Sequence, residues 1–175
     1  MIAYACDPKG GGEHWLGWGW AEQAAQSFEL ALITTPKAEA AVSSASEPLG
    51  IKTHFVEVPR TLRKVTELCG GAWLRKIAWQ NRVGKLAARL HQVNPFALIH
   101  QTTFHTFRSP FIASALPIPS IWGPIAGGEH VPPGFEKYLG SAAKSERARI
   151  IANRAWLKVP AVSRSFKCSA SVSPQ

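Results

Sequence analysis

The sequence lacks the long apolar segments that cross a membrane. No run of about 18 uninterrupted apolar residues occurs in the chain, and roughly that length is needed to span a bilayer. Residues 1–6 also lack the basic start and the long apolar run of a signal peptide, and are typical of a strand instead. We therefore expect neither a transmembrane helix nor an export signal.

Cysteine is scarce, and no two cysteines are close together in the sequence. The three cysteines, Cys6, Cys69 and Cys168, are odd in number and far apart, and no Cys-x-x-Cys pair occurs. Such usage is typical of free thiols in a reducing compartment. The sequence therefore predicts a cytoplasmic protein.

Acidic residues are also few, at 11 against 20 lysines and arginines, for a net charge of +9. Residues 60–89 and residues 137–167 each hold eight basic residues and one glutamate, which leaves 4 basic and 9 acidic residues elsewhere. Two basic helical segments on a partly acidic body suit an anionic surface or substrate, and solvated helices carry the same pattern. A further expected partner is the anionic inner face of a membrane, to which the protein would bind peripherally. Nucleic acid is not an expected partner, because the basic segments lack interleaved aromatic residues.

Several common catalytic motifs are missing. No Gly-x-Ser-x-Gly elbow is present, and the glycine run at 10–12 is not followed by the lysine of a phosphate-binding P-loop. No acidic residue closes a second strand as a dinucleotide site requires. His100 and His105 lie five residues apart with no nearby cysteine or aspartate, so no metal site is predicted.

What the sequence does contain is enough apolar material for one folded domain, at 46% hydrophobic and 18% charged residues. Short apolar runs alternate with helical patterns, which predicts a parallel sheet with helices on both faces, a Rossmann-like α/β domain over residues 1–167 and a frayed tail at 168–175. The expected strands are 2–6, 28–34, 51–58, 96–100 and 119–122. The expected helices are 14–26, 38–46, 73–92, 107–116, one from 134 or 135 to 156, and a short one from 160, with a basic connector before Gly70.

Three loops follow strands, and ligands of such sheets bind beyond the carboxyl ends of the strands. The loops are 7–14, 100–106 and 122–130. In the first, Gly10-Gly11-Gly12-Glu13 lets a ligand approach the backbone and opens a helix whose free N–H groups suit an anion. A simple tight turn is the alternative interpretation.

The other two loops carry side chains suited to polar ligands. His100 ends a buried strand and could move a proton near neutral pH, or be a hydrogen-bonded structural residue. Trp122 and Glu129 suit a sugar, by stacking and by accepting hydroxyl hydrogen bonds, although Glu129 could instead cap a backbone amide. Among the other tryptophans, we expect Trp15 and Trp18 in the core and Trp20 against a neighbour.

Three segments, taken in order, resemble a known family. They resemble the N-terminal part of family-4-type glycosyltransferases, and the resemblance extends to roughly Lys167. The segments are Ala3-Tyr4-Ala5-Cys6-Asp7-Pro8 with Gly12-Glu13 and Gly17-Trp18-Gly19-Trp20-Ala21, then Pro95-Phe96-Ala97-Leu98-Ile99-His100-Gln101-Thr102-Thr103-Phe104, then Ile121-Trp122-Gly123-Pro124-Ile125-Ala126-Gly127-Gly128-Glu129.

The resemblance implies a GT-B fold, in which two Rossmann-like domains face each other across a cleft. Such enzymes move a sugar from a nucleotide-sugar donor to an acceptor, usually with retention and without an essential metal or other cofactor. This chain would be the N-terminal, acceptor-side domain. The C-terminal nucleotide-sugar domain has no counterpart here, so we expect a fragment that is inactive by itself.

The resemblance also assigns residues by position. It places Gly11, Gly12 and Glu13 at the donor phosphates or sugar and His100 at the reaction centre. The remaining predicted residues would bind a glycan or lipid-linked acceptor: His105, Trp122, Glu129 and His130. Many relatives have a second histidine at the position of Thr102, so the choice between His100 and His105 stays open. The alternative function is a stand-alone, non-catalytic module that binds a glycan or a phosphorylated ligand.

Overall fold

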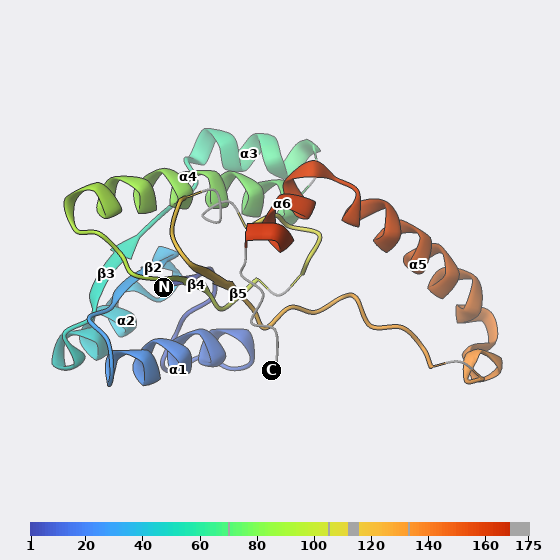
Figure 1. Cartoon of the computed structure of the whole chain (residues 1–175), viewed down its shortest axis with the longest axis horizontal. Coiled ribbons are helices and arrows are strands. Elements are labelled where there is room, and N and C mark those ends of the chain that lie inside the picture. The colour runs from blue at the N-terminus through green and yellow to red at the C-terminus, as the bar shows by residue number, and fades with distance from the viewer. Residues whose placement is uncertain (70, 105, 112–115, 133, 169–175) are drawn as a thin grey trace.

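The computed structural model describes residues 1–69, 71–104, 106–111, 116–132 and 134–168. A sheet of five parallel strands lies between two layers of helices (Figure 1). This confirms the predicted α/β, Rossmann-like architecture. The strands are β1 (Ile2–Ala3), β2 (Ala31–Thr34), β3 (Lys52–Phe55), β4 (Ile99–Gln101) and β5 (Ser120–Trp122).

The strand order in the sheet is β3-β2-β1-β4-β5. The chain runs outward from the central β1 to β2 and β3, and then returns to pair β4 with the other side of β1. Ile2 of β1 is in register with Gln101 of β4. The strand order therefore reverses between β1 and β4, and in open α/β sheets ligands bind at this switch point.

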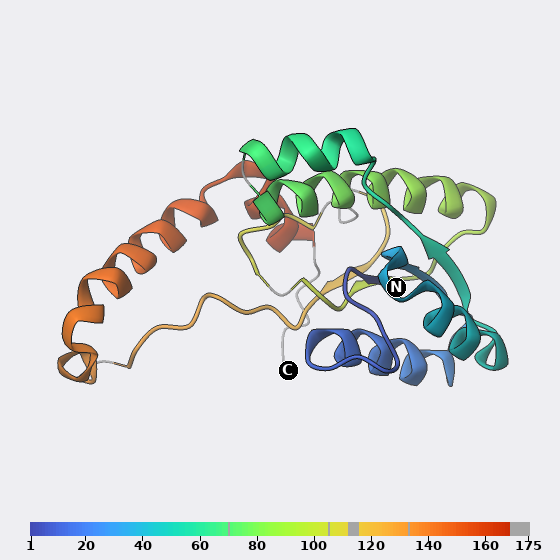
Figure 2. The ribbon, with the colours of Figure 1, turned by 180° about the vertical axis from the view of Figure 1, so that it is seen from behind.

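Helices cover both faces of the sheet. The α1 and α2 helices lie on one face, with α3 and α4 on the other, and the view from behind shows the same layers (Figure 2). Among the described residues, no helix has the length and apolar character to cross a bilayer. The helices are α1 (Glu13–Ala25), η1 (Pro36–Ala38), α2 (Glu39–Ser46), η2 (Glu47–Leu49), α3 (Arg60–Cys69), α4 (Gly71–Val93), η4 (Glu136–Ala142), α5 (Ala143–Leu157) and α6 (Pro160–Cys168).

Alternate strand residues feed two separate cores, as expected of strands buried on both faces. Ile2 and Ile33 pack into the core under α4 and α6, together with Trp79 and Val162. The neighbouring strand residues face α1 and α2 instead. This second core contains Ala3, Cys6, Trp18, Ala21, Leu30, Leu32, Val42 and Ile51.

The predicted connector before Gly70 is wrong, because Arg60–Cys69 forms the helix α3. Its sequence has no glycine or proline between Pro59 and Gly70, so nothing in the segment breaks a helix. The α3 helix contacts α4. The basic residues of 60–89 are therefore carried by two helices and not by a helix and a loop.

The helix predicted over 107–116 is also wrong for its described part. Residues 107–109 form a turn, with the Ser109 N–H donating to the Thr106 carbonyl. Phe107 and Phe111 are buried in the core, and an isolated bridge pairs Thr106 with Ala126. Residues 112–115 lie outside the described residues. Pro110 cannot donate a helical hydrogen bond, which favours this non-helical path.

The single long helix predicted to end near 156 is divided. The segment η4 precedes α5, and Gly140, which lies inside η4, interrupts its helical backbone with a φ of 52° and a ψ of −126°. Only glycine adopts such a backbone conformation readily. The α5 helix then points away from the sheet, as Figure 1 shows.

Trp15 does not lie in the core as predicted. It is 61% exposed, whereas Trp18 is 5% exposed. The α1 helix packs through its Gly17, Trp18 and Ala21 side, so Trp15 lies beyond the edge of the buried stripe.

Candidate functional site

The glycine loop lies at the switch point, between the end of β1 and the start of α1. The Gly10 N–H donates to the Asp7 carbonyl at 3.2 Å, and the Lys9 N–H donates to Asp7 Oδ1 at 2.9 Å, so the loop contains a tight turn. Gly12 has a φ of 57°, which requires glycine. A Cβ at Gly11 or Gly12 would meet no atom within 4 Å. The outer surface of the loop is therefore open for a ligand to approach the backbone.

Glu13 ties this loop to the loop after β4. Its carboxylate accepts a hydrogen bond from the Phe104 N–H. Phe104 has a φ of 73°, which is uncommon for a residue other than glycine. A second bond joins the same loops, from the Ala5 N–H to Thr103 Oγ1 at 3.1 Å, and it is buried. The predicted donor residue Glu13 thus also holds the two switch-point loops together.

His100 lies in β4, half-buried, with its ring against the edge of Trp20 at a centroid separation of 5.3 Å. Its Nε2 is 3.0 Å from the carbonyl oxygen of Gly123. A carbonyl can only accept, so Nε2 carries the proton and donates. The hydrogen-bonded structural role, one of the two left open by the sequence, is therefore present. Trp20 contacts this neighbour as expected.

The position of His100 predicts a pH dependence of stability. Burial lowers the pKa of His100 from its usual 6.5, although the bond to Gly123 opposes the shift. Below pH 6.5 the unfolded chain therefore binds more protons than the folded chain, so the free energy of unfolding falls until the pH passes the lowered pKa. Above pH 6.5 the contribution is constant.

We expect urea unfolding at about pH 7 and about pH 5 to show this fall, and His100→Gln to reduce it. Glutamine keeps a donor for the Gly123 carbonyl but does not titrate. Burial also lowers the pKa of His54, and lowers that of the Met1 amino group to about 5, so much of the fall should remain in this variant. An equal fall in the wild type and in His100→Gln would contradict the assignment.

Trp122 is 8% exposed and lies in the core beside Phe111 and Phe166. Its ring faces are occupied by protein, so the structure gives it packing rather than an open face for stacking on a sugar. His105 lies outside the described residues.

Glu129 and His130 lie on the segment that runs beside α5. The Gly127 N–H donates to Glu129 Oε2 at 2.7 Å, which is the backbone-capping alternative left open by the sequence. Hydrogen bonds from the N–H groups of Glu129 itself and of Gly127 lower the pKa of this carboxyl. The side chain is therefore ionised at neutral pH and can accept hydrogen bonds from hydroxyl groups.

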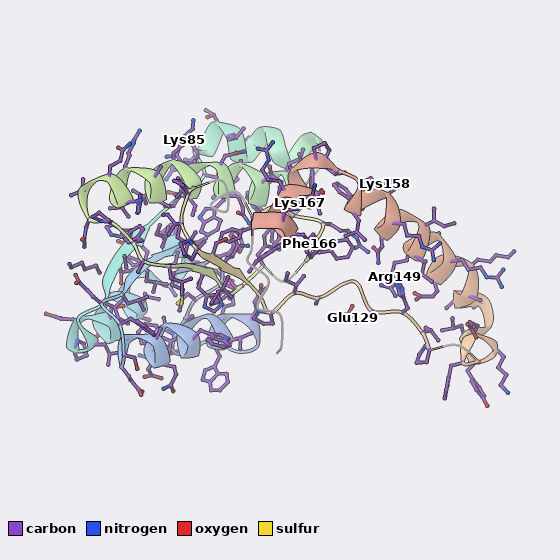
Figure 3. All side chains as sticks on the ribbon, in the orientation of Figure 1. Lys85, Glu129, Arg149, Lys158, Phe166 and Lys167 are labelled. Atoms are coloured by element: carbon purple, nitrogen blue, oxygen red, sulfur yellow. The ribbon has the colours of Figure 1, made fainter. Side chains whose placement is uncertain are left out.

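Two side chains of α5 hold this segment through its backbone. Asn153 Nδ2 donates to the Gly127 carbonyl at 2.8 Å, and the Arg149 guanidinium donates to the carbonyls of Gly127 and Glu129. Asn153 Oδ1 also accepts from the Arg108 guanidinium, with Nε at 3.0 Å. Figure 3 shows Arg149 on α5 directed toward Glu129 on the extended segment.

A concavity of about 410 Å³ lies between this segment and the helices α5 and α6. Its apolar lining comes from Phe107, Ile125, Leu157 and Phe166, and its polar lining includes Glu129, His130 and Arg154. Apolar walls with a few charged groups suit an amphipathic ligand such as a sugar on an apolar carrier. We name this concavity the α5 groove.

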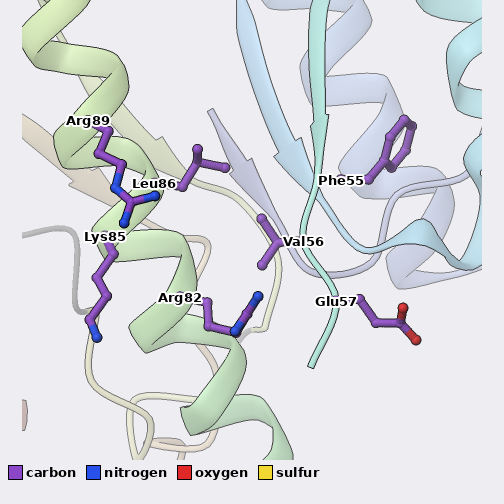
Figure 4. Close-up of a pocket in the computed structure, with 7 residues that line it drawn as sticks. All are labelled: Phe55, Val56, Glu57, Arg82, Lys85, Leu86 and Arg89. Carbon is purple, nitrogen blue, oxygen red and sulfur yellow. The ribbon is translucent and has the colours of Figure 1, made fainter. Parts of the chain in front are cut away.

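A second concavity, of about 290 Å³, lies between β3 and α4 (Figure 4). Its exposed charged lining is mainly basic, with Glu57 as the one acidic side chain, and Val56 and Leu86 are among its apolar lining. The basic residues, Arg82, Lys85 and Arg89, all come from α4. We name it the basic groove.

The structure thus brings Gly11, Gly12 and Glu13 together with the loop after β4, and brings His100 to the end of β5. The hydrogen bonds of Glu129 run to its own segment and to α5, away from the glycine loop. Sequence reasoning missed Asn153 and Arg149, which lie one helical turn apart on α5. The signal in the sequence was an asparagine four residues after an arginine in a basic helix, a spacing that places both side chains on one face.

Comparison of the chain with protein-family models, with curated proteins and with solved structures found no match. Among the described residues, no group of three or more histidine, cysteine, aspartate or glutamate side chains is placed to hold a metal ion.

Proposed function

We propose that this chain is the N-terminal, acceptor-side domain of a retaining glycosyltransferase of the GT-B type. One observation carries the proposal. The glycine loop and the loop after β4 meet at the switch point of a parallel sheet, joined by the Glu13–Phe104 and Thr103–Ala5 hydrogen bonds. This is the edge where α/β sheets bind nucleotide-containing ligands.

In this proposal the donor phosphates of a nucleotide sugar lie against the open backbone at Gly11 and Gly12. Glu13 fixes the path of that backbone through Phe104. Departure of the nucleotide diphosphate requires stabilisation of its developing charge, and the loop supplies only part of it. The rest would come from a second domain, so we expect no measurable turnover by these 175 residues alone.

The acceptor, a glycan or a lipid-linked sugar, would occupy the α5 groove. Its ionised Glu129 suits sugar hydroxyl groups, and its apolar lining suits an apolar carrier. His100, which the family resemblance places at the reaction centre, would hold the Gly123 turn at the end of β5. We therefore propose a positioning role for it.

A transfer assay tests the proposal. The polypeptide encoded by the complete reading frame is incubated with labelled nucleotide sugars and with glycan or lipid-linked acceptors. Gly11→Val should fold normally, because a Cβ added at Gly11 would meet nothing within 4 Å and the loop surface there is open. It should lose transfer by about 100-fold, because it obstructs the approach of the donor.

Gly19→Ala is the matched control, since Gly19 is equally open but lies inside α1. The proposal would be overturned if Gly11→Val kept its transfer activity. It would also be overturned if the wild type transferred sugar from none of the donors. Ligand binding without transfer from any donor would instead favour a stand-alone binding module. Robust transfer by the 175 residues alone would contradict the expected need for a second domain.

The basic groove supports a further partner, an anionic membrane surface. Arg82, Lys85 and Arg89 are exposed on one side of α4 (Figure 4). We expect the chain to sediment with anionic vesicles at low salt, and high salt to release it, because such attraction is screened. The triple variant Arg82→Gln, Lys85→Gln, Arg89→Gln should remain in the supernatant, and no binding at low salt would contradict the expectation.

A further inference from the structure

Lys76 occupies an unusual position above the switch point. It lies on α4 and is half-buried, with its Nζ 4.3 Å from the ring centroid of Phe104 and 5.4 Å from that of Tyr4. Tyr4 follows β1, and Phe104 lies in the loop after β4. The ammonium group therefore lies over residues from both strands between which the sheet order reverses.

The aromatic platform beneath the ammonium group is fixed. Phe104 is 4% exposed, and its N–H is held by Glu13 in a strained backbone conformation. Tyr4 packs edge-on against Trp79 with centroids 5.0 Å apart. Trp79 in turn donates from Nε1 to the Val56 carbonyl at 2.9 Å. A lysine side chain is otherwise flexible, and this platform restricts where its charge can lie.

The two rings attract the ammonium charge through their faces, and such contacts do not use its three N–H donors. Among the described residues, the recorded ion pairs join Lys52 to Glu29 and Arg149 to Glu146, and neither includes Lys76. Among these ion pairs no carboxylate neutralises Lys76, so its charge is available to an anionic ligand. A strained, non-glycine residue such as Phe104 commonly marks a functional site.

We propose that Lys76 binds a phosphate group of a ligand seated at the switch point. A compact ammonium charge suits phosphate oxygens, and Phe104, over which it lies, is joined by Glu13 to the glycine loop, which is open to an anion. The proposal rests on the proposed function only for the source of the phosphate, which is either the diphosphate of the donor or a phosphorylated acceptor. Nothing in the sequence pattern singled this residue out.

Calorimetric titration of the 175-residue chain at low ionic strength tests the proposal. The probes are inorganic phosphate, pyrophosphate, a nucleoside diphosphate and a sugar phosphate. Lys76→Met should weaken the binding of the preferred probe about tenfold or more, because a charge-assisted hydrogen bond is lost. Lys76→Arg, which keeps the charge, should weaken it by less than about threefold.

Lys144→Met is the matched control and should bind like the wild type, because Lys144 is exposed at the end of α5 that lies far from the sheet. Tightest binding of the nucleoside diphosphate indicates the donor as the source, and tightest binding of the sugar phosphate indicates the acceptor. Wild-type affinity in Lys76→Met, or no binding of any probe at about 10 mM, would overturn the proposal.

A second measurement needs no variant, in case Lys76→Met does not fold. The wild type is acetylated with and without pyrophosphate, and the modified lysines are quantified by mass spectrometry. Pyrophosphate should slow acetylation of Lys76 severalfold and leave Lys144 unchanged, and equal rates at Lys76 would also overturn the proposal. If pyrophosphate protects Lys76 from acetylation but no sugar transfer is found, only the proposed function is contradicted. If transfer is found without this protection, only the role of Lys76 is contradicted.

Discussion

Gly17→Ala is expected to destabilise the fold by about 3 kcal/mol or more. A Cβ at this position would lie 2.0 Å from the Ala5 carbonyl oxygen and 2.9 Å from Thr103 Cγ2. The first of these atoms belongs to the backbone, so α1 must move away from the end of β1 to make room. That movement would also disturb the bond from the Ala5 N–H to Thr103, which joins the two switch-point loops.

Thermal and urea unfolding measure the effect of Gly17→Ala. For a domain of this size the melting temperature should fall by about 6–12 °C. Gly19→Ala is the matched control, because Gly19 lies in the same helix and a Cβ there meets nothing within 4 Å. It should stabilise the chain by about 0.5–1 kcal/mol, since alanine favours a helix over glycine. Equal effects of the two variants would contradict the packing argument.

Asn153→Ala is expected to cost about 2–4 kcal/mol. The side chain is 3% exposed, and it joins the Arg108 guanidinium to the Gly127 carbonyl. Its removal leaves a charged donor and a backbone acceptor without this partner in a place with little water, which costs more than the bonds themselves contribute. The α5 helix should then loosen from the segment that carries Glu129.

Urea unfolding gives the stability of Asn153→Ala, and limited proteolysis reports on the segment 123–132 beside α5. We expect faster cleavage in this segment than in the wild type. The stability and the cleavage rate of Asn153→Asp should lie between those of the wild type and of Asn153→Ala. Aspartate keeps the acceptor for Arg108 but has no donor for the Gly127 carbonyl. Ser145→Ala, at an exposed position of the same helix, should change neither readout. Unchanged proteolysis in Asn153→Ala would show that Asn153 does not hold the segment.

The fold followed from the sequence where apolar spacing and length agreed. The runs around Ile2, Leu32 and Ile99 predicted parallel strands, because alternating short strands and helices have few stable arrangements. The strands are shorter than predicted, since apolar residues such as Val56 and Val58 continue into the core beyond the end of β3. Periodicity reports burial, and burial does not stop where sheet hydrogen bonding stops.

The site could be predicted less completely. Strand ends located the glycine loop and the loop after β4, because parallel strands end at one edge. The link from Glu13 to Phe104 depends on a backbone conformation of Phe104 that its side chain does not favour. Trp122 was predicted to stack on a sugar, but the packing of Phe111 and Phe166 buries it. Such outcomes depend on contacts between residues distant in sequence, which local patterns do not contain.

Because α5 holds the segment at 127–130 through backbone carbonyl groups, the path of that segment depends little on its side chains. Arg149 and Asn153 bind carbonyl groups, which every residue possesses. Gly127 has a φ of 94°, so few residues other than glycine fit at this position. A replacement at His130, by contrast, leaves the bonds from Arg149 and Asn153 in place. If the α5 groove binds an acceptor as proposed, homologous chains could therefore differ in the acceptor they select while keeping one backbone path. The α5 groove would then be a site whose selectivity evolves without a cost in folding.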